Sequence, residues 1–218
     1  KPPEPIPEGI VYPESDGDPM GETDLHIHWM KRLYDLLKYR YRDQRVYIGH
    51  NLLVYYDEGF PGNVIVPDVF VVKDCDPGFR RTFRIWDEQQ VPNVVFEITS
   101  KSTRTADEVR KPCKYQEMGV REFFLFDPTG DYLNPQLQGY RFNETRFGRV
   151  EPDADGMLEC QELDLQLWLM DDALVLRDRR TRETLLTEAE AQRVARGIAE
   201  SRAQAAEEEL RRVREELE

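Results

Sequence analysis

Two strand-like segments each carry a carboxylate at a position where the pattern calls for an apolar side chain. The segment 63–73 (NVIVPDVFVVK) contains Asp68, and the segment 92–99 (PNVVFEIT) contains Glu97. β-branched and aromatic residues dominate both segments, so each predicts a buried strand. A carboxylate on a core strand loses its hydration and needs a cation, a metal ion or several hydrogen-bond donors. These two acids therefore constrain both the fold and the chemistry of the chain.

Hydrophobic spacing predicts the other core elements. Apolar residues recur at three- and four-residue intervals over about 22–42, which predicts a helix, and residues 45–56 predict a further strand. A second helix is expected over about 105–118, and a short buried strand over 121–128. The order helix, three strands, helix, strand predicts an α/β (α+β) core.

Local signals mark the ends of these helices. Thr23 or Asp24 can cap the first helix, and Thr105 with Glu108 has the spacing of a capping box for the second. Pro112 lies well inside the second helix, where it removes a backbone hydrogen bond. We therefore expect a kink or an irregular turn next to it.

The composition changes along the chain and predicts three parts. Residues 1–19 are rich in Pro, Glu and Asp and are expected to form an extended arm. Residues 20–186 form the predicted domain, with a small β appendage over about 132–186. Residues 187–218 are rich in Ala, Glu and Arg and predict one long helix. Its apolar stripe is poor, so a short coiled coil and a solvated helical tail both remain open.

Short strands are expected within the appendage. A hairpin is predicted around 143–145, and residues 162–169 alternate apolar and polar side chains. Residues 173–178 and 183–187 are expected to complete the appendage as two more strands.

The charge and the cysteines limit the classes of function. A net charge of −13 argues against a basic surface for non-specific nucleic-acid binding. It favours small or cationic ligands, or a site in which metal ions bridge to phosphate. No run is long enough to cross a membrane. Cys75, Cys113 and Cys160 are odd in number and widely spaced, which argues against a disulfide framework or a zinc site and predicts a cytoplasmic protein.

The polar residues in apolar surroundings predict one cluster. Neighbouring antiparallel strands would bring Asp68 and Glu97 together, while Asp107, Lys111 and Tyr115 are spaced four apart and share one face of the second helix. Two close carboxylates repel each other unless a divalent cation lies between them. Hard oxygen ligands predict Mg²⁺ or Mn²⁺, with a nearby lysine that offsets charge developing on a phosphate.

Each residue also has a structural explanation that the sequence leaves open. Asp68 can shape a turn after proline, and Glu97 can be a structural acid held by an arginine. Lys111 can be an ordinary solvated partner of Asp107.

Four blocks in this order resemble a known group. They are PD at 67–68, EITSKST at 97–103, DEVRKPCKY at 107–115 and GVREFFLFDP at 119–128. Together they resemble the Uma-type restriction endonuclease family, a branch of the PD-(D/E)XK nuclease superfamily. The resemblance covers about residues 11–187. It implies a restriction-endonuclease-like fold and a Mg²⁺-dependent endonuclease that hydrolyses DNA.

The resemblance also implies roles for individual residues. Asp68 and Glu97 would bind the metal together with the backbone carbonyl of Ile98, and Glu22 would supply an auxiliary acid. The sequence departs from the superfamily two residues after Glu97, where Thr99 stands in place of a lysine. The catalytic lysine is then expected from the helix at Lys111, with Lys101 as the rival.

The segment 78–86 (GFRRTFRIW) is the basic cluster between the two acids. Arg80, Arg81 and Arg84 alternate there with aromatic residues, so they are candidates for contacts with DNA, together with Tyr115. The alternative is a surface loop anchored by its aromatic side chains. A second hypothesis for the whole chain is a catalytically inactive nuclease fold that acts as a binding or assembly module, or forms a homo-oligomer, through its helical tail.

Overall fold

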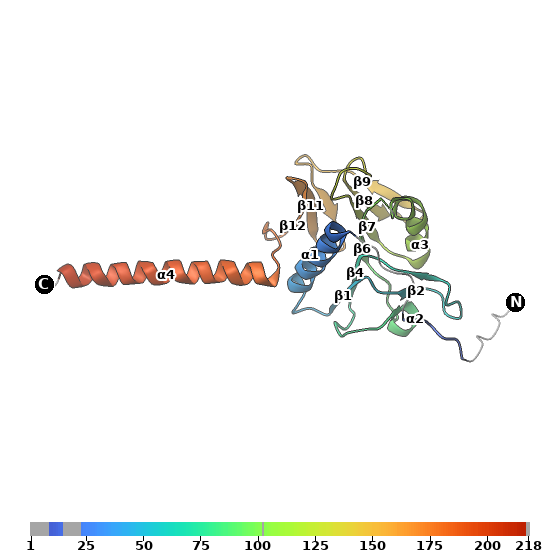
Figure 1. Cartoon of the computed structure of the whole chain (residues 1–218), viewed down its shortest axis with the longest axis horizontal. Coiled ribbons are helices and arrows are strands. Elements are labelled where there is room, and N and C mark those ends of the chain that lie inside the picture. The colour runs from blue at the N-terminus through green and yellow to red at the C-terminus, as the bar shows by residue number, and fades with distance from the viewer. Residues whose placement is uncertain (1–8, 15–22, 102, 217–218) are drawn as a thin grey trace. The chain divides into compact units, whose positions relative to one another are not determined.

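The computed structural model describes residues 9–14, 23–101 and 103–216. The chain divides into two compact units, Lys1–Leu185 and Leu186–Glu218. In the first unit, helices and strands pack as an α/β domain (Figure 1). The predicted fold class and its core order are confirmed, because one helix, three strands of the main sheet, a second helix and a fourth strand follow one another.

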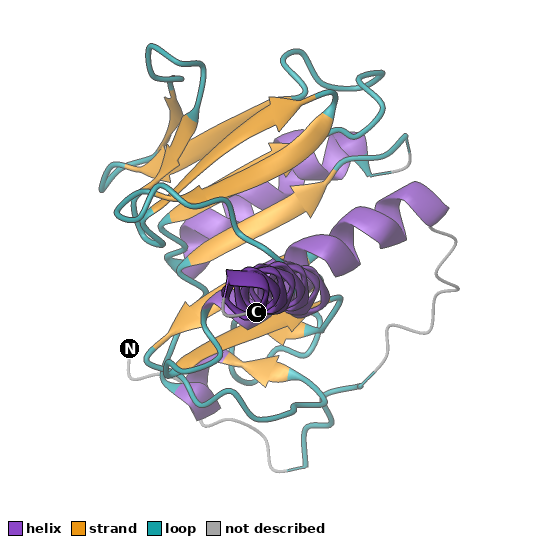
Figure 2. Cartoon of the chain, turned by 90° about the vertical axis from the view of Figure 1, so that its left-hand side faces the viewer, coloured by secondary structure: helices purple, strands orange, loops and turns teal. Residues whose placement is uncertain are grey.

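A six-stranded mixed sheet forms the centre of the first unit. Its strands lie in the order β1-β4-β6-β7-β8-β9, and only β6 and β7 are parallel. The helices and strands are distinguished by colour in Figure 2. The six strands are β1 (Val46–His50), β4 (Val69–Lys73), β6 (Val94–Ile98), β7 (Glu122–Phe126), β8 (Leu137–Phe142) and β9 (Phe147–Val150).

Helices α1 (Asp24–Arg40) and α3 (Lys111–Met118) cover opposite faces of this sheet. Side chains alternate between the faces of a strand, so one set of residues meets each helix. Leu33 of α1 packs in one core with Phe96, while Tyr115 of α3 packs in the other core with Val95. Thr23 caps α1 as expected, since its hydroxyl accepts a hydrogen bond from the His26 N–H at 3.3 Å.

Two of the predicted strands are shorter than expected because each divides between two sheets. Residues 45–56 break at Asn51, which has a positive φ of 44° and whose N–H donates to the carbonyl of Asp68. Residues 63–73 break at the Pro67–Asp68 pair, since proline cannot donate to a strand ladder. The outer pieces form a small sheet in the order β3-β2-β5. Its strands are β2 (Val54–Tyr55), β3 (Val64–Ile65) and β5 (Phe83–Arg84), and α2 (Ile85–Glu88) follows directly.

The β appendage is smaller than predicted. The hairpin around 143–145 exists, but its strands β8 and β9 extend the main sheet. Only β10 (Leu158–Cys160), β11 (Leu165–Met170) and β12 (Ala173–Asp178) form a separate sheet. Their apolar side chains share the core under α1. The strand predicted at 183–187 is wrong, because that segment contributes only an isolated bridge between Arg177 and Thr184.

A five-residue π-helical turn, η1 (Ala106–Arg110), precedes α3. Pro112 explains it, because its ring displaces the carbonyl four residues earlier and it has no N–H to donate. The Lys111 N–H instead reaches back five residues to the Ala106 carbonyl. The irregular turn expected next to Pro112 is therefore confirmed. The capping box at Thr105 is wrong, since Thr105 is helical and its side chain makes no cap hydrogen bond.

The second unit is the helix α4 (Glu188–Glu216), as predicted. Thr187 and Glu190 form a capping box, in which each backbone N–H donates to the side chain of the other residue. The larger apolar side chains of α4 are exposed, namely Val194, Ile198, Leu210 and Val213. Among the described residues, no helix combines the length and the apolar character that a membrane span requires.

Candidate active site

The register of β4 and β6 places Asp68 and Glu97 opposite each other. Val69 pairs with Phe96 in this antiparallel pair, so the preceding Asp68 and the following Glu97 continue the same ladder. Opposite residues of an antiparallel pair project to the same face. Here that face is the one covered by α3, and the Asp68 N–H donates to Glu97 Oε2 at 3.3 Å. The predicted convergence of the two acids is thus present.

Asp68 accepts hydrogen bonds from two different elements. The Ile98 N–H of β6 donates to its Oδ2 at 2.6 Å, and His26 Nε2 of α1 lies 3.1 Å from the same atom. Burial alone would raise the pKa of Asp68, but the hydrogen bond from His26 and the charge of Lys111 outweigh it and lower the pKa. Asp68 is therefore held as a carboxylate, with 11% of its side chain exposed.

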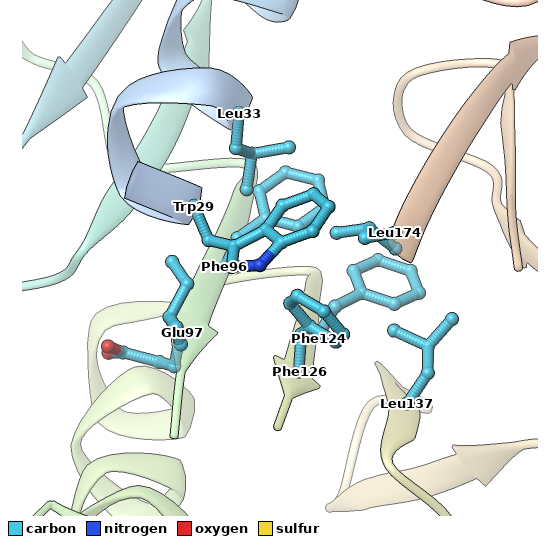
Figure 3. Close-up of a pocket in the computed structure, with 9 residues that line it drawn as sticks. Trp29, Leu33, Phe96, Glu97, Phe124, Phe126, Leu137 and Leu174 are labelled. Atoms are coloured by element: carbon cyan, nitrogen blue, oxygen red, sulfur yellow. The ribbon is translucent and has the colours of Figure 1, made fainter. Parts of the chain in front are cut away.

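Glu97 is enclosed by α3. Lys111 Nζ donates to its Oε2 at 2.7 Å, and the hydroxyl of Tyr115 donates to its Oε1. Figure 3 shows its carboxyl group pointing away from the apolar side chains of Trp29 and Phe96, which line a hollow on the other face of the sheet. Burial, opposed by the ammonium group of Lys111, raises the pKa of Glu97 to about 8.

Lys111 joins Glu97 to a third acid. Its Nζ lies 3.0 Å from Asp107 Oδ1, and the side chains of both acids are fully buried. The π-helical turn brings Asp107 to this face one turn before Lys111. Burial alone would lower the pKa of Lys111, but the charges of Glu97 and Asp107 raise it. Burial also raises the pKa of Asp107. Two buried acids thus share one ammonium group, whose charge also acts to lower the pKa of Asp68.

The donor set fits a hard divalent cation. Asp68 and Glu97 offer carboxylate oxygens from adjacent strands. Burial, together with the charges of Asp68 and Asp107, raises the pKa of Glu97, so a bound cation would stabilise its charged form. The N–H and carbonyl of one residue in an extended strand point to the same side, so the Ile98 carbonyl faces the Asp68 side of β6. Among the described residues no three His, Cys, Asp or Glu side chains form a metal-binding group. Mg²⁺ commonly uses only one or two carboxylates and completes its shell with water and phosphate.

The two candidate lysines lie in different surroundings. Lys111 contacts Glu97 directly, whereas Lys101 is exposed in the turn after β6. Glu22, the predicted auxiliary acid, lies outside the described residues. Tyr115 was expected to contact substrate, but its side chain is fully buried and its hydroxyl contacts Glu97. In this arrangement Tyr115 positions Glu97 and does not meet a ligand directly.

The three arginines do not join the carboxylate cluster. Arg80 pairs with Glu88 through two nitrogens, Arg81 pairs with Glu14, and Arg84 pairs with a neighbouring residue of α2. The arrangement matches the alternative of an anchored surface loop only in part. Phe83 is fully buried and anchors the segment, whereas Phe79 is fully exposed.

Two residues of the cluster were not assigned site roles from the sequence. His26 lies within hydrogen-bond distance of Asp68 itself. In the sequence, Asp107 stands out only for its spacing from Lys111, and the structure buries it completely. The available signal for His26 is its spacing of four residues from Glu22, but its partner Asp68 lies 42 residues away.

A family of known proteins resembles the chain in sequence. Residues 10–170 match the model of a family described as "Uma2: Putative restriction endonuclease". The chain belongs to this family of restriction endonuclease type, and the resemblance inferred from the four sequence blocks is confirmed. No curated protein matches the chain.

A solved structure is also similar to it, that of a putative nuclease belonging to DUF820 from Anabaena variabilis ATCC 29413. The two chains are 16% identical with a TM-score of 0.47, and the similarity covers 65% of this chain and 74% of the other.

Proposed function

We propose that the chain is a divalent-metal-dependent endodeoxyribonuclease that hydrolyses phosphodiester bonds at the Asp68–Glu97 site. One observation carries the proposal: two carboxylates on adjacent strands converge, and a partly buried lysine contacts one of them. Membership of a restriction endonuclease family supports the nuclease class.

Asp68, Glu97 and the Ile98 carbonyl would hold Mg²⁺ or Mn²⁺. When bound, such an ion polarises a phosphoryl oxygen and lowers the pKa of a bound water. His26 keeps Asp68 ionised and fixes its orientation, as outer-shell partners of metal ligands commonly do.

Residues of η1 and α3 complete the site. Lys111, placed between Glu97 and Asp107, supplies the positive charge that offsets charge developing on the phosphate. Asp107 positions that ammonium group. Tyr115 positions Glu97 through its hydroxyl group, which donates to the carboxylate oxygen that Lys111 does not contact.

Incubation of the pure chain with plasmid DNA and Mg²⁺ or Mn²⁺ tests the proposal. We expect cleavage that stops in EDTA and that Asp68→Ala reduces to the level seen in EDTA. Glu108→Gln is the matched control, because it removes an exposed carboxylate whose ion pair is with Arg104. Cleavage that survives Asp68→Ala or EDTA contradicts the mechanism.

The lysine assignment has its own comparison. Lys111→Ala is expected to abolish cleavage, whereas Lys101→Ala is expected to leave it intact, since Lys101 is exposed. The reverse pattern would transfer the catalytic role to Lys101.

Self-association through α4 is a separate proposal, motivated by the exposed Val194, Ile198, Leu210 and Val213. Sedimentation of the full chain and of a chain ending at Leu186 tests it. Equal numbers of subunits in both contradict it.

A further inference from the structure

A pocket of about 150 Å³ lies beside β1, separate from the carboxylate cluster. The strand β1 is at the edge of the six-stranded sheet, so the pocket borders a strand with no neighbour on that side in the sheet. Residues of α1 and of the loop at 77–80 complete its lining. The side chains that matter here are Tyr34, Lys38, Tyr47, His50, Phe79 and Arg80.

Four of the eleven residues that line this edge pocket carry aromatic rings. The rings of Tyr34 and His50 lie 4.5 Å apart, and the Arg80 guanidinium lies 4.2 Å from the centre of the Tyr47 ring. Phe79 is completely exposed at the rim, so the domain core does not account for it. Flat rings around a hollow suit a planar ligand.

The charge of the edge pocket is nearly balanced. The Arg80 guanidinium is already engaged by Glu88 and by two backbone carbonyls. Burial lowers the pKa of His50, which leaves its ring neutral near pH 7, although the charge of Asp35 opposes the shift. Lys38 makes no ion pair within the described part of the chain. One cation beside neutral aromatic surfaces fits a neutral ring attached to a single anionic group.

The edge pocket is adjacent to the proposed site of cleavage. His50 pairs with Val69, the residue after Asp68, and neighbouring strands lie roughly 5 Å apart. Tyr34 lies eight residues along α1 from His26, which corresponds to about 12 Å. A substrate strand with a phosphate at Asp68 can therefore extend to the edge pocket.

We propose that the edge pocket binds one unpaired nucleobase of the nucleic-acid substrate, with Phe79 as a stacking surface and Lys38 on a flanking phosphate. The proposal rests on the nuclease function proposed above and adds single-stranded or locally opened substrate to it. The volume is below the roughly 300–1,000 Å³ of sites for drug-sized ligands, so it suits one ring system and not a whole nucleotide.

The test measures binding of the full chain to a fluorescent single-stranded oligonucleotide in EDTA, so that no strand is cut. A second oligonucleotide of the same length has abasic residues in place of its nucleotides. We expect the oligonucleotide with bases to bind more tightly. We also expect Phe79→Ala to weaken its binding about 5- to 100-fold while leaving abasic binding unchanged.

Two further variants complete the test. Phe60→Ala is the matched control, because Phe60 is also an exposed phenylalanine but does not line the edge pocket, and it is expected to bind normally. Lys38→Gln is expected to make the slope of log binding constant against log salt concentration less steep by about one. Equal binding of both oligonucleotides, or equal losses for Phe79→Ala and Phe60→Ala, overturns the proposal.

This outcome is separable from that of the nuclease proposal. If the chain cleaves plasmid in Mg²⁺ but binds both oligonucleotides equally, the nuclease proposal stands and the edge-pocket proposal is contradicted. If it binds bases through Phe79 but never cleaves DNA, base binding at the edge pocket stands and the nuclease proposal is contradicted.

Discussion

Replacing Lys111 by methionine separates the two tasks of this side chain, which are to neutralise buried acids and to serve catalysis. The variant Lys111→Met keeps the length of the side chain but leaves Glu97 and Asp107, both fully buried, without their cation. Removing one partner of a buried ion pair costs about 3–5 kcal/mol of unfolding free energy. For a domain of this size that corresponds to a Tm lower by about 6–20 °C.

The loss is expected to depend on pH. Without the ammonium group, the raised pKa of Glu97 rises further, so the folded variant holds protons that the unfolded chain releases. Its stability therefore falls as pH rises. The loss of unfolding free energy, relative to the unsubstituted chain, is expected to be larger at pH 9 than at pH 6. Adding Glu97→Gln should recover part of the stability without restoring cleavage, because a neutral amide needs no cation.

Thermal and urea unfolding of the metal-free chain at both pH values measure these effects. Lys101→Met is the control, since exposed substitutions usually change stability by less than about 0.5 kcal/mol. A Lys111→Met variant as stable as this control at both pH values would refute the assignment of Lys111 as the buried counter-ion.

Three further predictions concern the metal site and the sheet. His26→Ala is expected to weaken Mg²⁺ binding about 10- to 100-fold in calorimetric titration, because Asp68 loses its outer partner, whereas the exposed His28→Ala is expected to be neutral. Because the pKa of Glu97 is about 8, Mg²⁺ affinity should increase from pH 6.5 to 8 and then level off. Titrations in buffers of different ionisation enthalpy should show proton release at pH 7, and its absence would contradict the raised pKa. Gly49→Ala is expected to lower the unfolding free energy by roughly 1–3 kcal/mol, because its Cβ would lie 2.3 Å from a buried phenyl ring, and unchanged urea unfolding would refute this packing.

The convergence of Asp68 and Glu97 could be predicted from sequence because it depends on short-range rules. Each acid lies in a strand whose apolar residues fix its register, and strand alternation then fixes the face. Pro112 likewise predicted an irregular turn, since its missing N–H is a local property. The π-helical form of that turn depends on how the chain relaxes around the proline, which the residue pattern does not specify.

The predictions discussed next fail because the sequence does not specify which sheet or side chain an element packs against. The run at 45–56 looks continuous because the residues on both sides of Asn51 are apolar, yet the two halves enter different sheets. The strands β8 and β9 have the alternation expected of an appendage, and the same alternation serves the edge of the main sheet. The contact of His26 with Asp68 arises only when α1 docks on the sheet. Local patterns predict an element and its buried face, but they leave its neighbours undetermined.

The one parallel pair of the six-stranded sheet, β6 and β7, makes the chain pass over that sheet between Ile98 and Glu122. Because β6 and β7 run in the same direction, the connection leaves β6 at the end next to Glu97 and returns to the opposite end of the sheet, where β7 begins. Residues 99–101 and 103–105 begin that passage, directly after the strand that carries Glu97. Exchanging them is a route to altered substrate preference that leaves the strands and their acids in place.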